Sequence, residues 1–165
     1  MTALVRKGLI VALLHLAIVG SLGAKLLVDR ATRPRVWART APIDPDSPLR
    51  GRYVQLRVES HDPINLPKDS YSTPVSLAAR DGMLVLAPSS SETGLTAHPI
   101  SRDGRPVPVL DQPLAYFIPE DVPDPSFRRA GEELWVEVTL PRHGPPRPIR
   151  LAVKKDGVLT PLDLD

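Results

Sequence analysis

The residues that could carry out acid–base or nucleophilic chemistry are few, and they are scattered along the chain. A Ser–Lys dyad needs a lysine whose pKa is lowered by burial. Lys68 follows Pro67, and Lys154 and Lys155 precede a turn, so all three are expected to be solvated. Glu120 and Asp121 form a carboxylate pair that could do acid–base work. Their Glu-Asp-Val-Pro-Asp-Pro context is more typical of a solvated acidic loop.

The chain offers no pattern for binding a metal or a phosphate. Its four histidines lack ligand-like spacing, and one of them falls in an apolar segment. There is no cysteine, so thiolate metal sites and disulfides are excluded. A glycine-rich phosphate loop and a Gly-x-Ser-x-Gly elbow are also missing from the sequence. We therefore expect no metal and no cofactor. The histidines are His15, His61, His98 and His143.

The N-terminus predicts a membrane anchor in residues 1–28. Arg6 and Lys7 precede an apolar run over residues 8–24, which residues 26–28 extend. A membrane-spanning helix needs about 17–25 such residues. We expect residues 8–28 to contact the lipid bilayer.

A cleaved signal peptide is the alternative for this segment. Ser21-Leu22-Gly23 is a small-x-small site before Ala24, but the apolar run exceeds the usual 7–15 residues of a signal peptide and continues past that site. Basic residues flank both ends, so the charge pattern is compatible with either orientation.

Charge divides the chain into two parts. Residues 1–39 hold seven Lys/Arg and one Asp, a net charge of +6, whereas residues 40–165 hold fourteen Lys/Arg and eighteen Asp/Glu, a net charge of −4. The mildly acidic part has few aromatic residues, and it lacks the basic footprint of a nucleic-acid-binding protein.

The rest of the chain predicts short β-strands. Residues 53–59 alternate strictly, with Val54, Leu56 and Val58 on one face. Three Asp-Gly pairs, at 81–82, 103–104 and 156–157, lie between strand-like flanks and predict hairpin turns. In residues 133–139, Leu134, Val136 and Val138 share a face.

These patterns predict a mainly β protein of seven to nine strands. We expect a small antiparallel β-barrel or sandwich behind one N-terminal transmembrane helix. The predicted organisation is an anchor (1–28), a basic, proline-containing linker (29–48) in which Trp37 would be an interfacial anchor, and a β-rich domain (49–165).

The mouth of the first predicted strand carries a resemblance to a known family. Residues 51–58, Gly-Arg-Tyr-Val-Gln-Leu-Arg-Val, resemble the signature Gly-Asp-Tyr-x-x-Leu-x-Tyr of the GDYXXLXY-domain family of bacterial membrane-anchored proteins. Gly51, Tyr53 and Leu56 match, while Arg52 replaces the Asp and Val58 replaces the last Tyr. Tyr-Phe-Ile-Pro-Glu, residues 116–120, resembles the second landmark of the family.

The resemblance implies an anchored domain outside the cytoplasm, and it implies no established activity. We expect the soluble domain of a single-pass protein of the bacterial inner membrane. The candidate binding residues are Arg52, Tyr53, Tyr116 and Glu120.

Three functions follow as hypotheses. The first is a non-enzymatic accessory module that binds another membrane protein, and it predicts an exposed apolar patch around Tyr53, Tyr116 and Trp135. The second is an envelope hydrolase or peptidase, which requires a buried polar cluster with a perturbed pKa, for example Glu120 with a nearby Arg. The third is a barrel that binds a small ligand in a preformed pocket.

Overall fold

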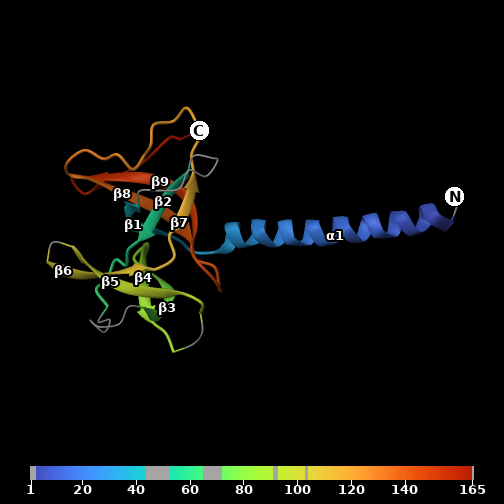
Figure 1. Ribbon diagram of the computed structural model, residues 1–165, viewed down its shortest axis with the longest axis horizontal. Coiled ribbons are helices and arrows are strands. Elements are labelled where there is room, and N and C mark those ends of the chain that lie inside the picture. Colours follow the sequence, from blue (N-terminus) through green and yellow to red (C-terminus); the bar gives the residue numbers. More distant parts are fainter. Residues whose placement is uncertain (1–2, 44–52, 65–71, 91–92, 103, 165) are drawn as a thin grey trace. The chain divides into compact units, whose positions relative to one another are not determined.

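The computed structural model describes residues 3–43, 53–64, 72–90, 93–102 and 104–164. Within it the chain forms two compact units, residues 1–33 and residues 34–165. The first unit contains one helix, α1 (Ala3–Thr32), and the second contains the strands (Figure 1).

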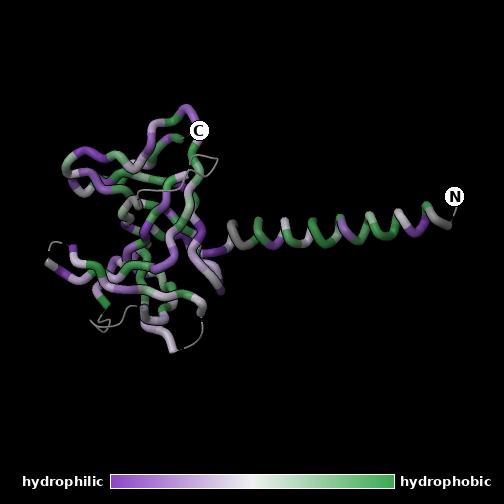
Figure 2. The backbone as a smooth tube through the Cα atoms, in the orientation of Figure 1, coloured by the Kyte–Doolittle hydropathy of each residue, from purple (hydrophilic) through white to green (hydrophobic). Residues whose placement is uncertain are grey.

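The first unit is a helix whose apolar side chains are exposed. Val5–Val28 of α1 has a mean hydropathy of 2.0 and none of it is buried, and Figure 2 shows apolar residues along most of its length. Its polar side chains bond to the helix's own backbone: the His15 Nδ1 lies 2.8 Å from the Val11 carbonyl oxygen, and the Ser21 hydroxyl donates to the Ile18 carbonyl. This is how polar side chains are tolerated where no water is available.

The second unit is a mixed sheet of ten strands, not closed into a barrel, so neither the predicted barrel nor the predicted sandwich is confirmed. The mainly β composition is confirmed. The strands are β1 (Arg35–Ile43), β2 (Tyr53–Val58), β3 (Thr73–Arg80), β4 (Met83–Pro88), β5 (Thr96–Arg102), β6 (Arg105–Leu110), β7 (Leu114–Phe117), β8 (Glu132–Thr139), β9 (Arg147–Lys155) and β10 (Val158–Pro161).

The strand order is β10-β9-β8-β1-β4-β3-β5-β6, with β2 paired to β1 and β7 paired to β2. All pairings are antiparallel except the short parallel contact of β1 with β4, at Trp37 and Met83. In Figure 1, β8 and β9 lie on one side of β1 and β2, and β3–β6 lie on the other.

The Asp-Gly hairpins are formed as predicted at two turns. Asp81-Gly82 joins β3 to β4 and Asp156-Gly157 joins β9 to β10, with positive φ at all four residues. Positive φ is what a tight hairpin turn requires and what Asp-Gly supplies. At the third turn, between β5 and β6, Gly104 has φ 74°, and Asp103 lies outside the described residues.

The segment predicted as a linker contains β1, a strand with partners on both sides. Val36, Ala38 and Thr40 are buried, whereas Trp37 lies beneath the Arg150 guanidinium, 5.4 Å from the ring centre, rather than serving as a free anchor. The alternation is masked in the sequence by the arginines of the other face and by prolines near both ends.

The apolar core takes alternating residues from β1, β2, β4 and β8, and further buried residues from β3, β5, β6, β7 and β9. In β2, Val54, Leu56 and Val58 are buried and the residues between them are half-buried, as predicted. In β8 the predicted face of Leu134, Val136 and Val138 is buried, but so is the opposite face. The largest fully buried side chains are Leu56, Leu84, Leu86, Leu110, Leu134, Leu151, Val36, Val58, Val75, Val109, Val136 and Val138.

We expect Leu56→Ala to destabilise the sheet by about 2–5 kcal/mol, because the Leu56 side chain is completely buried and its loss leaves a cavity. The measurement is urea unfolding of the detergent-solubilised full chain, followed by circular dichroism. Val158→Ala, at a valine that is 66% exposed, is the control and should change the unfolding free energy by less than about 0.5 kcal/mol. Equal effects of the two substitutions would contradict the core assignment.

Candidate functional site

The second face of β8 is buried beneath a layer of charged and aromatic side chains. The register places Arg39 of β1 opposite Trp135 of β8, and Glu133 of β8 opposite Lys154 of β9. The ammonium of Lys154 lies 4.7 Å from the centre of the Trp135 ring, a distance at which a cation is attracted to the ring face. Trp135 is therefore only 4% exposed.

A buried carboxylate lies at the edge of this layer. Glu59, the residue after β2, is 2% exposed and accepts a hydrogen bond of 2.5 Å from Arg102 Nη2 of β5. The Nε of Arg39 lies 3.9 Å from the other Glu59 oxygen, while its Nη2 lies 2.8 Å from Glu133 Oε1. The Trp135 indole donates to the second oxygen of Glu133 at 3.1 Å.

Burial raises the pKa of Glu59 above its ordinary value of 4.5. The positive charges of Arg102 and Arg39 act in the opposite direction, and the negative charge of Glu133 adds to the rise. Removal from water thus outweighs two neighbouring guanidinium groups. A carboxylate poised in this way is a common feature of functional sites, although structural ion-pair networks also produce it.

These groups line a pocket of about 310 Å³, close to the smallest volume typical of small-molecule sites. The buried Ser60 hydroxyl accepts a hydrogen bond from the Leu86 backbone N–H at 3.0 Å. No hydrogen bond joins Ser60 to Lys154 in the described part of the chain, so the pocket does not present a formed Ser–Lys dyad. The lining residues are Arg39, Glu59, Ser60, His61, Val107, Glu133, Trp135 and Lys154.

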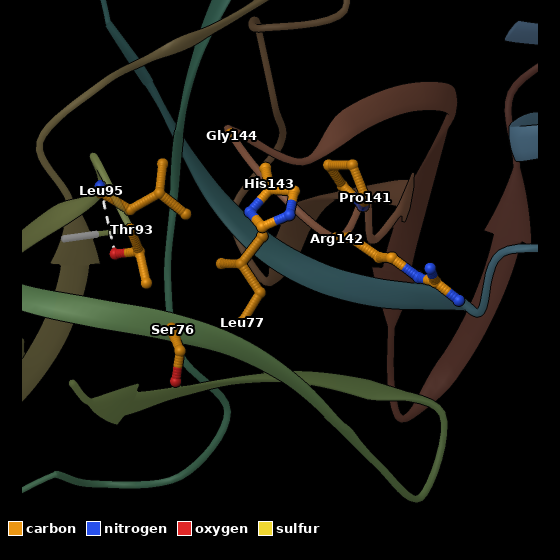
Figure 3. Close-up of a pocket in the computed structure, with 8 residues that line it drawn as sticks. All are labelled: Ser76, Leu77, Thr93, Leu95, Pro141, Arg142, His143 and Gly144. Atoms are coloured by element: carbon orange, nitrogen blue, oxygen red, sulfur yellow. Dashed lines mark hydrogen bonds between the residues drawn. The ribbon is translucent and has the colours of Figure 1, made fainter. Parts of the chain in front are cut away.

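A second, smaller pocket of about 90 Å³ lies between β3 and the segment after β8 (Figure 3). The imidazole of His143 points towards Leu77, and the guanidinium of Arg142 points away from the pocket. The Thr93 hydroxyl donates to the Val75 carbonyl at 2.6 Å and the Ser76 hydroxyl donates to the Ala87 carbonyl at 3.4 Å. Both hydroxyl groups donate their protons to backbone carbonyl oxygens, so neither is activated as a nucleophile.

The structure separates the residues predicted to form a binding patch. Tyr53 packs against Phe117, with ring centres 6.1 Å apart, and Tyr116 is half-buried against the apolar core. The prediction that Trp135 belongs to an exposed apolar patch is wrong, because Lys154 and the hydrogen-bonded Glu133 cover it. Glu120 is exposed.

Of the family-motif residues, Leu56 is fully buried in the core. Gly51 and Arg52 lie outside the described residues, as does Lys68. Among the residues described, no three His, Asp or Glu side chains converge as metal ligands. His98 instead pairs with Asp111, and Lys155 pairs with Glu132 at 3.5 Å.

The residues of the larger pocket were not predicted as a site. Arg39 was assigned to the linker and Lys154 to a solvated turn. A signal was nevertheless present in residues 133–137, where Glu, Trp and Glu alternate with core residues and so must share the second face of β8.

The raised pKa of Glu59 predicts a pH dependence of stability. Unfolded Glu59 loses its proton near pH 4.5, whereas folded Glu59 holds its proton to higher pH, so its contribution to stability falls as pH rises from about 4.5 through the folded pKa. We expect the unfolding free energy of the native chain, minus that of Glu59→Gln, to decrease over this range. Urea titrations of both proteins between about pH 4 and 8 measure this difference in unfolding free energy. An increase of the difference with pH would contradict a raised pKa of Glu59.

Comparisons with known proteins identify the family. Curated proteins and solved structures gave no match to this chain. The family model described as "GDYXXLXY protein" matches residues 15–164, which include the last part of α1 and all ten strands. The chain therefore belongs to the GDYXXLXY protein family.

Proposed function

We propose that this protein is a single-pass inner-membrane protein of a bacterium, whose β domain lies outside the cytoplasm and binds another membrane protein without catalysing a reaction. The observation that carries the proposal is an aromatic pair on neighbouring strands, in which the exposed Phe117 packs against the half-buried Tyr53 of the family motif.

The helix supports the anchor. Val5–Val28 has 24 residues, which span about 36 Å at 1.5 Å per residue and exceed the roughly 30 Å hydrocarbon core of a bilayer. Large apolar side chains are exposed all along it, and they would otherwise face water at a considerable free-energy cost. A tether of this kind confines the domain to the membrane surface, where other membrane proteins are its nearest neighbours.

The aromatic pair supports partner binding. Phe117 is 75% exposed, although phenylalanine is among the residues most often buried in proteins. It ends β7, which pairs with β2 and with no other described strand. Phe127, in the segment that follows, is 82% exposed. Aromatic side chains at a strand edge supply the large apolar area that anchors protein interfaces.

The hydrolase hypothesis receives less support from the structure. It requires a buried polar cluster with a perturbed pKa, for which Glu120 was the predicted example, and Glu120 is exposed. The described carboxylate that is buried and carries a raised pKa is Glu59, which is held by Arg102.

The absence of cysteine from the sequence makes the orientation testable. A single cysteine in place of Val158, which is 66% exposed on β10, should react with a membrane-impermeant maleimide in intact spheroplasts. Val5→Cys, at the other end of the helix, should react only after the cells are lysed. The reverse pattern would place the β domain in the cytoplasm. Intact mass spectrometry of the same samples shows whether the anchor is retained.

Photo-crosslinking from position 117 tests the partner surface. A photoreactive amino acid in place of Phe117 should give a discrete crosslink to one membrane protein in cells, because this side chain is 75% exposed. The same amino acid at Val158, an exposed position on the far strand of the sheet, is the matched control and should not give that product. Identical products from both positions would contradict a specific interface.

Phe117→Ala should remove most of the partner recovered with the native chain, while the unfolding free energy changes by less than about 0.5 kcal/mol because the side chain is already exposed. Co-purification and urea unfolding of the same protein separate lost binding from lost folding. Retention of the partner at its native level would exclude Phe117 as an anchor.

A further inference from the structure

The pocket beside Glu59 contains hydrogen-bond donors that have no acceptor. Arg39 forms an ion pair with Glu133, with its Nη2 2.8 Å from Oε1, and its buried Nε has no hydrogen-bond partner among the described residues, since the nearest Glu59 oxygen lies 3.9 Å away. The ammonium of Lys154 contacts the Trp135 ring and forms no ion pair with a described carboxylate. The Ser60 hydroxyl accepts from the Leu86 N–H, and its own proton has no acceptor in the described structure.

The carboxylates of the pocket, in contrast, are each held by cations. Glu59 Oε1 accepts from Arg102 and Glu59 Oε2 lies 3.9 Å from the Nε of Arg39. Glu133 accepts from the Trp135 indole and forms an ion pair with Arg39 at 2.8 Å. A ligand that enters this pocket therefore gains most by bringing acceptors, since an unpaired buried donor costs about 1–3 kcal/mol.

The charges of the cluster set the charge of that ligand. Arg102, which does not line the pocket, forms an ion pair with Glu59, so that the lining cations Arg39 and Lys154 stand against one remaining carboxylate, that of Glu133. The net charge of +1 is balanced by one negative charge. A dianion would bring a second charge close to Glu59 and Glu133, and like charges at short range are unfavourable.

The volume and the apolar walls of the pocket limit the size of the ligand and the polarity of its body. A volume of about 310 Å³ lies at the lower end of the range for small-molecule sites. Val107 and the edge of Trp135 provide apolar wall beside the polar groups.

We propose that this pocket binds a small monocarboxylate with a short apolar body. The carboxylate accepts hydrogen bonds from the guanidinium of Arg39, with Lys154 as the second cation, and the apolar body lies against Val107 and Trp135. Glu59 serves as a positioning residue, because it holds Arg102 and lies 3.9 Å from the Nε of Arg39. This binding site is separate from the aromatic pair at β7 on which the proposed partner interaction rests.

The test uses the full chain in lipid nanodiscs with Trp37→Phe, so that Trp135 is the one remaining tryptophan. The probes share one carbon skeleton: 3-methylbutanoate, 3-methylbutylamine and 3-methylbutanol, with inorganic phosphate as the dianion-forming control. We expect 3-methylbutanoate to change the Trp135 fluorescence with a saturable curve, and the amine and the alcohol to give no saturable change. Phosphate should bind at least about tenfold more weakly, for lack of apolar contact and because of its second charge.

Two substitutions in the same background identify the carboxylate site. Lys154→Gln and Arg39→Gln should each weaken 3-methylbutanoate binding about tenfold or more, as expected for loss of a hydrogen bond to a charged group. Arg150→Gln is the matched control. Like Lys154, Arg150 belongs to β9 and lies over the ring of a tryptophan, Trp37, but it does not line the pocket. It should leave the dissociation constant within about twofold. If Arg39→Gln does not fold by circular dichroism, Lys154→Gln alone decides the test.

The proposal is overturned by any of three results. The first is the lack of a saturable response to 3-methylbutanoate. The second is an equal response to the amine or the alcohol, which would show apolar partitioning without charge recognition. The third is tighter binding of phosphate, which would assign the pocket to a different anion.

Discussion

The burial of the Glu59 carboxylate constrains how the strands of this sheet meet. Glu59 follows β2, and its neighbours come from three other strands: Arg39 of β1, Arg102 of β5 and Val109 of β6, to which it is bridged. Removing one partner of a buried ion pair typically costs about 3–5 kcal/mol, because the remaining charge is left uncompensated. These strands must therefore keep their relative positions for the carboxylate to stay satisfied, and the pocket beside it is held in a fixed shape.

The same constraint explains why β8 is buried on both faces although only one is apolar. On one face, Leu134, Val136 and Val138 pack in the apolar core. On the other face, Trp135 and Glu137 are buried, with the Lys154 ammonium over the Trp135 ring and the Arg150 guanidinium hydrogen-bonded to Glu137. Cationic side chains of β9 thus lie over the second face of β8. A single sheet can thus bury a central strand without closing into a barrel.

The sequence predicted those parts of the fold that depend on local chemistry. The hairpins at Asp81-Gly82 and Asp156-Gly157 are encoded by adjacent residues, and the alternation of β2 is uninterrupted, so both could be recognised. Strand β1 was missed because its inward residues are small or polar and its outward residues are charged, which resembles a linker when neighbours are unknown. The Glu59 cluster was missed for another reason. Its members come from four strands, and only the pairing register brings Arg39 beside Trp135 and Lys154 beside Glu133.

The net charge of the β unit does not predict the charge of its pocket. Residues 34–165 hold sixteen Lys/Arg and eighteen Asp/Glu, a net charge of −2, yet the cluster around Glu59 is net positive because the cations outnumber the carboxylates locally. A small ligand responds to the groups within a few ångströms, since more distant surface charges are screened by water and salt. An acidic β unit can therefore select an anion, and the aromatic pair at Tyr53 and Phe117 can serve a protein partner independently. The two surfaces have different chemistry, one a donor-rich, partly open pocket and the other an apolar surface at the exposed Phe117, so a single chain could present both without either compromising the other.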